Sequence, residues 1–179
     1  LNITNRQIDV LAIAGLVNDL GHVMFSHVFE NVIAKSLSIE IIDHEDLSKD
    51  LFKDLVDKYK IKLSKDEVEI ICNMIDPPDN LKNNFLYQIV CNKKSSVDVD
   101  KFDYICRDSY HIGLSYKFDF SRIIMQVRVI NNQICFPDKL SFDLHELFYT
   151  RYRLHKQVYS HKVVRNLELL VGDIILNFK

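Results

Sequence analysis

Apolar residues recur every three or four positions along most of this chain, which is the spacing of one face of an α-helix. The first stripe consists of five positions: Ile8, Leu11, Ala12, Gly15 and Leu16. The stripe continues to Asp19 and His22, so the core-facing side of this predicted helix becomes ionisable at its end. Gly21 is a natural helix stop, and a second amphipathic helix is expected over residues 25–33.

Later segments keep the helical period. The stretch "IIDHEDLSKDLFKDLVDKY" is typical of a loop followed by a helix, and the capping-box pair Ser64 and Glu67 predicts the start of another helix. Residues 85–113 favour two helices separated by the polar segment "NKKSS". Residues 143–179 favour one or two long helices, so most of the chain is expected to be helical.

One segment departs from the helical period. In "QVRVINNQICF", two alternating runs flank Asn131 and Asn132, which predicts a β-hairpin near residues 126–137. Four Gly and three Pro are too few turn residues for a β-sandwich or barrel of 179 residues, and a hydrophobic content of 47% is ample for a core. We therefore expect a mainly α fold with one small hairpin, in a single domain over residues 1–179.

Charge and cysteine content narrow the functional classes. The net charge of −2 gives the whole chain no reason to bind nucleic acid or acidic membranes, so any basic site must be local. The cysteines include no CxxC pair, which is typical of reduced thiols in an intracellular protein. No apolar run reaches the roughly 18 residues of a membrane span. We expect a soluble protein of the nucleus or cytoplasm. We also expect a fragment of a longer protein, because the sequence begins at Leu1 within a helical pattern.

Three clusters of polar residues are candidates for chemistry. The first is Asp19, His22 and His27 in "VNDLGHVMFSH". An ionised carboxylate is costly to bury unless it is paired or bound to a metal, so Asp19 is predicted to have a cation partner. Taken alone, each histidine is more often a structural residue, and the core-facing Asp19 is what favours a functional role.

The second cluster is a polar stripe in "DVDKFDYICRDSYHIG". Its members recur on successive turns of a predicted helix: Asp100, Lys101, Tyr104, Arg107, Asp108 and His111. The simplest alternative is a solvated face with salt bridges. A phosphorylated sugar would be bound by these residue types, because they offer a carboxylate for a metal, a cation for phosphate and a ring for the ribose.

The third cluster is the basic segment "YTRYRLHKQVYSHKVVR". Arg151, His155, Tyr159 and Lys162 recur at four-, four- and three-residue steps, so they are predicted to share a face. Such a face could bind a polyphosphate or the backbone of a nucleic acid, or be only a cationic surface. A smaller element, "DHED", places the titratable His44 beside the carboxylate of Glu45.

Four blocks of the chain, in order, are similar to one known family. The blocks are "IAGLVNDLGHVMFSHVFE", "DHED", "FLYQIVCNKKSSVDVDKFDYICRDSYHIG" and "LFYTRYRLHKQVYSHKVV". They resemble the HD-domain deoxynucleoside triphosphate triphosphohydrolases, most of all the eukaryotic type that carries an additional SAM domain. The resemblance implies the all-helical HD fold and hydrolysis of a deoxynucleoside triphosphate (dNTP) to the deoxynucleoside and triphosphate.

The resemblance also implies a divalent metal, which could be Mg²⁺, Mn²⁺, Fe²⁺ or Zn²⁺. Asp19 and Asp100 match two of its ligands, whereas Asn18 stands where the family has a histidine, and the family's first histidine would lie upstream of Leu1. Because an amide oxygen is a harder and weaker ligand than imidazole, Asn18 is expected to bias the site towards Mg²⁺ or Mn²⁺.

The remaining site residues carry over from the same family. Around the attacking water and the scissile phosphate, the resemblance places His22, His44 and Glu45. For the phosphates it places His27 close by, Lys101 and Arg151 as binding cations, and Glu30 where the family has an Asp. For the nucleoside it places Tyr104 and Asp108 on the sugar and Tyr159 near the ribose and base.

Three functions stay open at this point. The first is metal-dependent hydrolysis of dNTPs. The second is nucleotide binding without hydrolysis, because Asn18 weakens the metal site. The third is binding of single-stranded nucleic acid through the helix containing Arg151. Assembly into a homo-oligomer is an expectation from the resemblance alone.

Overall fold

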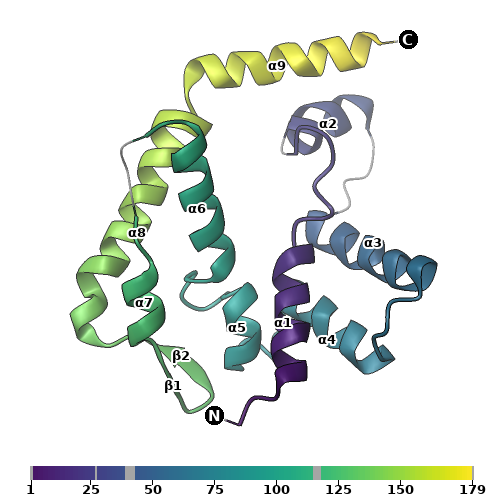
Figure 1. Cartoon of the computed structure of the whole chain (residues 1–179). Helices are drawn as coiled ribbons and strands as arrows, with labels where there is room; N and C mark the ends of the chain where they lie inside the picture. Colours follow the sequence, from purple (N-terminus) through teal and green to yellow (C-terminus); the bar gives the residue numbers. More distant parts are fainter. Residues whose placement is uncertain (1, 27, 39–42, 115–117, 179) are drawn as a thin grey trace.

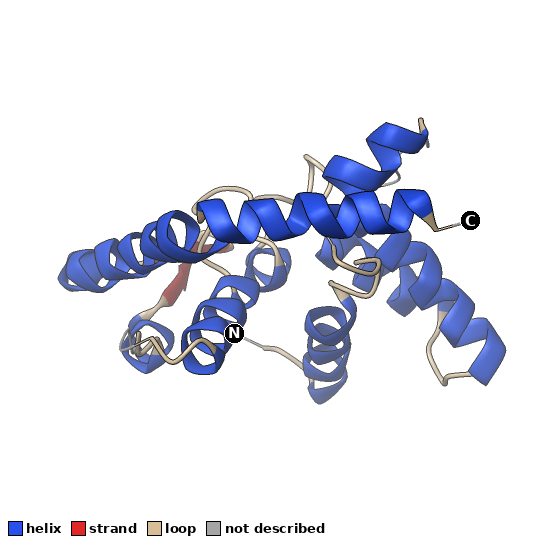
Figure 2. Ribbon diagram, turned by 90° about the horizontal axis from the view of Figure 1, so that it is seen from above, coloured by secondary structure: helices blue, strands red, loops and turns tan. Residues whose placement is uncertain are grey.

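The structure is a computed structural model that describes residues 2–26, 28–38, 43–114 and 118–178. It is mainly helical with one two-stranded sheet, as predicted (Figures 1 and 2). The elements are α1 (Asn5–Val17), the π-helical η1 (Phe29–Ile33), α2 (Ala34–Leu37), α3 (His44–Tyr59), α4 (Lys65–Ile75), α5 (Phe85–Val90), α6 (Val99–His111), α7 (Ser121–Gln126), β1 (Arg128–Ile130), β2 (Gln133–Cys135), the 3₁₀ turn η2 (Asp138–Leu140), α8 (Ser141–Leu154), the π-helical η3 (His155–Tyr159) and α9 (Lys162–Asn177). None of the described helices combines the length and apolarity needed to cross a membrane.

Side-chain caps determine where several helices begin. The predicted capping box at Ser64 and Glu67 is present at the start of α4. The helix predicted in "IIDHEDLSKDLFKDLVDKY" is α3, and it begins at His44. The reason is the carboxylate of Asp43, which accepts a hydrogen bond from the backbone N–H of Glu45 at 3.2 Å and caps the helix.

The predicted hairpin is confirmed. Strands β1 and β2 pair antiparallel, with Arg128 opposite Cys135. The turn residues Asn131 and Asn132 have φ angles of 50° and 60°, which asparagine tolerates better than most residues, and two such residues form the turn that matches strand twist. The hairpin is joined to α5 by the side chain of Gln88, whose oxygen accepts from the backbone N–H of Ile134 at 2.8 Å.

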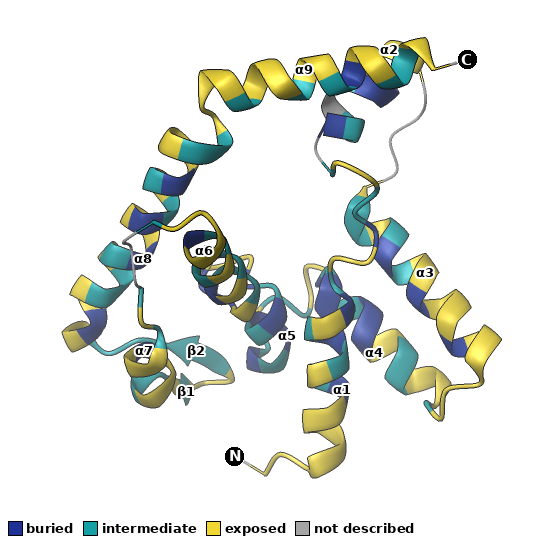
Figure 3. Cartoon of the chain, turned by 45° about the horizontal axis from the view of Figure 1, so that its top comes forward, coloured by how far each residue is buried: buried dark blue, intermediate teal, exposed yellow. Residues whose placement is uncertain are grey.

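Two hydrophobic clusters form the core, and Figure 3 shows their buried faces turned inward. The first joins α1, α3, α4 and α5, and includes Val10, Ala14, Val17, Phe52, Ile71, Met74 and Val90. The second joins α6, α7 and α8, and includes Phe102, Ile105, Ile123, Leu147 and Leu154. Each fully buried aliphatic side chain contributes about 1.5–3 kcal/mol to stability, so each cluster is a substantial core.

The first helix differs from the prediction in both face and length. Its buried residues are Val10, Ala14 and Val17, whereas Leu16, predicted to face the core, is 81% exposed. Apolar residues surround much of this helix, so spacing alone chose the wrong stripe; packing of α1 against α4 selects the buried one. The helix ends at Val17, so Asp19 and His22 lie in the turns that follow it rather than on its surface.

The predicted helix over residues 25–33 is only partly present. Phe25 and Ser26 have φ angles of 64° and 43° and form a turn, and regular structure resumes with the π-helical η1. The last helix, α9, crosses the top of the molecule and packs on η1 (Figure 1). Gly172 allows this approach, since a Cβ atom there would lie 2.5 Å from Cγ1 of Val32.

The junction of α1 and α3 is the tightest contact near the polar residues. The hydroxyl of the fully buried Ser48 accepts from the backbone N–H of Gly21 and donates to the backbone carbonyl of Asn18, both at 2.7 Å. A Cβ atom on Gly21 would overlap the carbonyl oxygen of His44 and would lie 2.6 Å from the Ser48 nitrogen. Only glycine fits at this position without moving α3.

We expect Gly21→Ala to lower the free energy of unfolding by about 1–3 kcal/mol, because the added methyl group meets backbone atoms that cannot rotate away. Gly15→Ala is the matched control: nothing lies within 4 Å of its Cβ position in α1, so helix propensity should raise stability by about 0.5–1 kcal/mol. Urea unfolding of both variants measures the difference. Equal effects at the two positions would contradict the close contact.

Candidate active site

Three helix ends converge on one pocket. The C-terminal end of α1 and the N-terminal ends of α3 and α6 surround an open pocket of about 150 Å³. Its lining is Asn18, Asp19, His44, Glu45, Ile75, Val90, Cys91, Asp98, Asp100 and Lys101. Six of the residues that the sequence predicted for the site are in this lining, although they are up to 83 positions apart in the chain, from Asn18 to Lys101. Four carboxylates and one lysine make the pocket strongly acidic.

Asn18 and Asp100 link α1 to α6 inside the pocket. The amide nitrogen of Asn18 donates to Oδ1 of Asp100 at 3.4 Å. Burial raises the pKa of the Asp100 carboxyl, and the nearby carboxylates of Asp19 and Asp98 raise it further. An ionised Asp100 is therefore costly in this position without a cation beside it.

Asp98 is a site residue that the sequence analysis missed. It is 4% exposed, and its carboxylate accepts from the backbone N–H of Lys101 at 3.1 Å and lies 3.0 Å from the lysine Nζ. It also accepts from the backbone N–H of Asn92, which fixes the segment that joins the two hydrophobic clusters. Its place immediately before an amphipathic run was the available signal, because aspartate there is a favoured helix cap.

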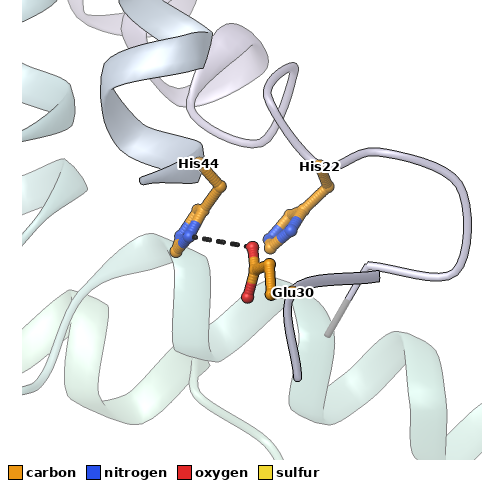
Figure 4. A group of neighbouring side chains, drawn as sticks. All are labelled: His22, Glu30 and His44. Carbon is orange, nitrogen blue, oxygen red and sulfur yellow. Dashed lines mark ion pairs between the residues drawn. The ribbon is translucent and has the colours of Figure 1, made fainter. Parts of the chain in front are cut away.

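His22, Glu30 and His44 form a second polar group at the edge of the pocket, and their side chains point towards one another (Figure 4). The two imidazole rings stack with their centroids 4.3 Å apart. His44 Nδ1 lies 3.9 Å from Oε1 of Glu30 and 3.2 Å from Oδ1 of Asp43, and His22 Nε2 lies 3.6 Å from Oδ1 of Asp19. His22 therefore connects this group to the carboxylates of the pocket.

Glu45 and Asp43 have opposite electrostatic environments at the start of α3. Burial raises the pKa of the Glu45 carboxyl, and the neighbouring charge of Asp43 adds to this effect. The backbone N–H of Glu45 donates to Asp43 and lowers the pKa of that carboxyl. Of the two, Glu45 is the better proton acceptor or donor, and it is the one that lines the pocket.

An ion-pair network holds α3 in place behind these residues. Lys49 on α3 contacts Asp76, the residue that ends α4, at 3.2 Å, and Lys93 forms a further ion pair with Asp76. Because all three side chains are at least two-thirds buried, this network is less screened than a surface pair. It fixes α3, and with it His44 and Glu45, against the rest of the first cluster.

The sugar and phosphate candidates form a separate group farther along α6. Arg151 Nε donates to the hydroxyl of Tyr104 at 2.9 Å, and the hydroxyl of Tyr159 donates to Asp108. Asp100, Tyr104 and Asp108 are four residues apart, so they share a face of α6 and extend about 12 Å along its axis. This face runs from the acidic pocket to the tyrosine and arginine side chains.

Two predicted stripes are shorter in the structure than in the sequence. Arg107 and His111 are exposed, and Arg107 pairs with Asp103 on the solvent side of α6. The predicted face that joined Arg151 to Lys162 is interrupted, because the chain passes through the π-helical η3 and a break at Ser160 before α9 begins at Lys162. His27 lies outside the described residues.

The carboxylates of the pocket fit a hard divalent cation better than a transition metal. Asp19 and Asp100 offer oxygen ligands, and a cation would offset the charge that raises the pKa of Asp100. Among the described residues, neither Asp19 nor Asp100 belongs to a compact group of three metal-ligating side chains. A cation in this pocket therefore needs further ligands, such as the phosphates of a nucleotide.

Comparison with known proteins supports one family. No family model matches the chain. It is 42% identical over 175 residues, 97% of its length, to the deoxynucleoside triphosphate triphosphohydrolase SAMHD1 homolog of Dictyostelium discoideum. It is 37% identical over 93% of its length to the putative HD domain-containing protein L394 of Acanthamoeba polyphaga mimivirus, and 34% identical over 98% of its length to human deoxynucleoside triphosphate triphosphohydrolase SAMHD1.

The chain spans about a third of the length of these relatives, with 34%, 37% and 32% of each covered. The similarity runs through nearly the whole chain, and the helical fold with its small hairpin agrees with the one that the sequence resemblance implied. The resemblance seen in the sequence is therefore confirmed: nearly the whole chain is similar to proteins named as HD-domain proteins and deoxynucleoside triphosphate triphosphohydrolases.

Proposed function

We propose that this protein hydrolyses dNTPs to the deoxynucleoside and inorganic triphosphate. The observation that carries the proposal is one face of α6. At one end of this face lies the acidic pocket with its imidazole and carboxyl groups, and at the other end lie the tyrosine and arginine side chains. The family relationship supports the same activity, since the relatives are named for it. In the reaction, water attacks the α-phosphorus and the bond to the 5′ oxygen breaks; the 5′ oxygen takes up a proton.

The proton-transfer groups are His22, His44 and Glu45. Histidine suits this work because its ordinary pKa, about 6.5, is close to neutral pH. The stacked imidazoles and the buried carboxyl of Glu45 lie on the pocket edge, where one group can accept a proton from water and another can supply one to the leaving 5′ oxygen.

Lys101, Arg151, Tyr104, Asp108 and Tyr159 bind the substrate. Lys101, held by the buried Asp98, meets the triphosphate near the pocket. Arg151 adds a forked cation, and Tyr104 packs on the sugar. Asp108 accepts from a sugar hydroxyl while Tyr159 limits the space beside it.

Asp19 and Asp100, with Asn18 beside them, would hold a divalent cation, which supplies neutralisation of the triphosphate charge when bound. Burial of Asp100 among carboxylates supports this placement. Asn18 orients Asp100 through its amide nitrogen, so its part is positioning as well as binding.

The direct test is turnover of a mixture of the four dNTPs by the full-length protein, with Mg²⁺, Mn²⁺ or Fe²⁺ added separately. Released triphosphate is separated by chromatography. We expect triphosphate with Mg²⁺ or Mn²⁺. Nucleotide binding without product under any of the metals would instead support the alternative, a nucleotide-binding relative without hydrolysis.

We expect His22→Ala to lower kcat roughly 10²- to 10⁴-fold with little change in dNTP affinity, because it removes a proton-transfer group and no phosphate ligand. His145→Ala, an exposed histidine on α8, is the control and should keep the wild-type rate. Rates come from released triphosphate and affinity from equilibrium dialysis. An unchanged kcat in His22→Ala would remove its assignment.

Arg151→Lys should raise KM roughly tenfold or more, because lysine cannot reproduce the forked donors that contact Tyr104 and the phosphates. Arg153→Lys is the matched control two residues along α8, where the guanidinium lies over the ring of Tyr149. Initial rates against dNTP concentration measure both. A similar KM in the two variants would place substrate binding elsewhere.

Asp100→Asn should raise the free energy of unfolding at neutral pH in the absence of divalent cations. The pKa of the Asp100 carboxyl is higher in the folded protein than in the unfolded chain. The free energy of unfolding therefore decreases as pH rises from the unfolded pKa through the folded pKa, and an amide, which does not ionise, avoids this decrease. Mg²⁺ added together with a non-hydrolysable dNTP analogue, whose phosphates complete the ligand set, should stabilise the wild type more than the variant. Asp103→Asn is the control: this carboxylate is 66% exposed and paired with Arg107, so the variant should respond like the wild type. Equal Mg²⁺ stabilisation of all three would exclude Asp100 as a ligand.

A further inference from the structure

His22, Glu30 and His44 come from three separate elements and meet at one point (Figure 4). His22 follows α1, Glu30 lies in the π-helical η1, and His44 opens α3. One ligand atom from each lies within 4.8 Å of the others, and each side chain is partly buried. A π-helical turn shifts the direction of its side chains relative to an α-helix, and such turns are frequent at functional sites.

The donor set is two imidazole nitrogens and one carboxylate oxygen. This combination binds Zn²⁺ and neighbouring transition-metal dications and leaves further coordination positions open. In a tetrahedral zinc site, ligand atoms lie about 3.3 Å apart. Atoms now within 4.8 Å reach that spacing if each side chain moves by about 1 Å. Side-chain exposures of 24%, 22% and 29% for His22, Glu30 and His44 leave room for such a shift.

Nearby carboxylates favour a cation at this point. Asp19 lies 3.6 Å from His22 Nε2, and Asp43 lies 3.2 Å from His44 Nδ1. These two carboxylates add negative charge beside the histidines, which attracts a cation. The two rings stack with their centroids 4.3 Å apart, so both imidazoles lie beside the same point.

A competing group, Asp43, His44 and Glu45, is a weaker candidate. Its members are consecutive in the chain, and Asp43 already accepts a hydrogen bond as the cap of α3. Moving that carboxylate onto a metal would uncap the helix. Glu30 comes from a different element from the two histidines, and its carboxylate points at both imidazoles (Figure 4).

We propose that His22, Glu30 and His44 form a binding site for a transition-metal dication of the Zn²⁺ type, separate from the Asp19 and Asp100 carboxylates. A metal there occupies imidazole nitrogens that the proposed hydrolysis uses for proton transfer. The protein with a metal at these histidines should therefore differ in hydrolytic activity from the protein without one. Binding itself is measured without nucleotide, so it does not depend on the proposed function.

The test is titration of the purified full-length protein with Co²⁺ alone, followed by visible absorption, because Co²⁺ replaces Zn²⁺ at such sites and shows d–d bands when bound by nitrogen and oxygen ligands. We expect one Co²⁺ per chain and loss of the bands when Zn²⁺ is added. Absence of binding in the wild type would overturn the proposal.

Glu30→Gln and His22→Gln should each weaken Co²⁺ binding at least tenfold, since each removes one of the three ligands. Asp100→Asn is the control, and it should leave the Co²⁺ bands and affinity unchanged. Loss of binding in Asp100→Asn with binding retained in Glu30→Gln would place the metal in the carboxylate pocket and refute the site. Circular dichroism of each variant confirms that its helices are intact, and because Glu30→Gln conserves size, it keeps the test decisive if His22→Gln unfolds.

Discussion

The contact between Gly21 and the start of α3 determines where the chemistry of this protein lies. Ser48 is fully buried and uses its hydroxyl twice, towards Gly21 and towards Asn18. A side chain on Gly21 would separate the two segments, since the His44 carbonyl occupies that space. Asp19 and His22 on one side and His44 and Glu45 on the other are adjacent because of this contact. Without it the pocket would open between the end of α1 and the start of α3.

Helix α6 also determines where the polar groups lie, because one of its faces packs in the core and the other carries polar side chains. Its buried face, with Phe102 and Ile105, belongs to the core of the second cluster. Its other face places Asp100 at the pocket and Asp108 about 12 Å farther on. A rigid helix of this length can bind two parts of one extended ligand at a constant separation, which suits a nucleoside triphosphate.

Charge is distributed unevenly in a chain that is nearly neutral overall. Four carboxylates line the pocket with one lysine, whereas Arg151 lies at the other end of the α6 face. Burial and mutual repulsion raise the pKa of Asp100 and Glu45. A bound cation would offset the cost of both effects, so the groups that lower the stability of the free protein favour a metal or a metal-bound nucleotide. The two imidazoles beside Glu30 extend this preference to softer metals.

The sequence alone determined the helical class and the hairpin at Asn131 and Asn132, and it suggested which residue types could form a site, because period, turn chemistry and motif order are local properties. It did not determine the buried face of α1, since apolar residues there allow more than one stripe and only α4 selects Val10, Ala14 and Val17.

Tertiary structure also decided which polar residues meet. Asp98 and Ser48 gain their roles from burial, and the grouping of His22, Glu30 and His44 depends on a π-helical turn and on the missing side chain of Gly21. These are contacts between segments distant in the chain. Spacing within one segment carries no information about them, because the distance between two segments is set by what packs between them.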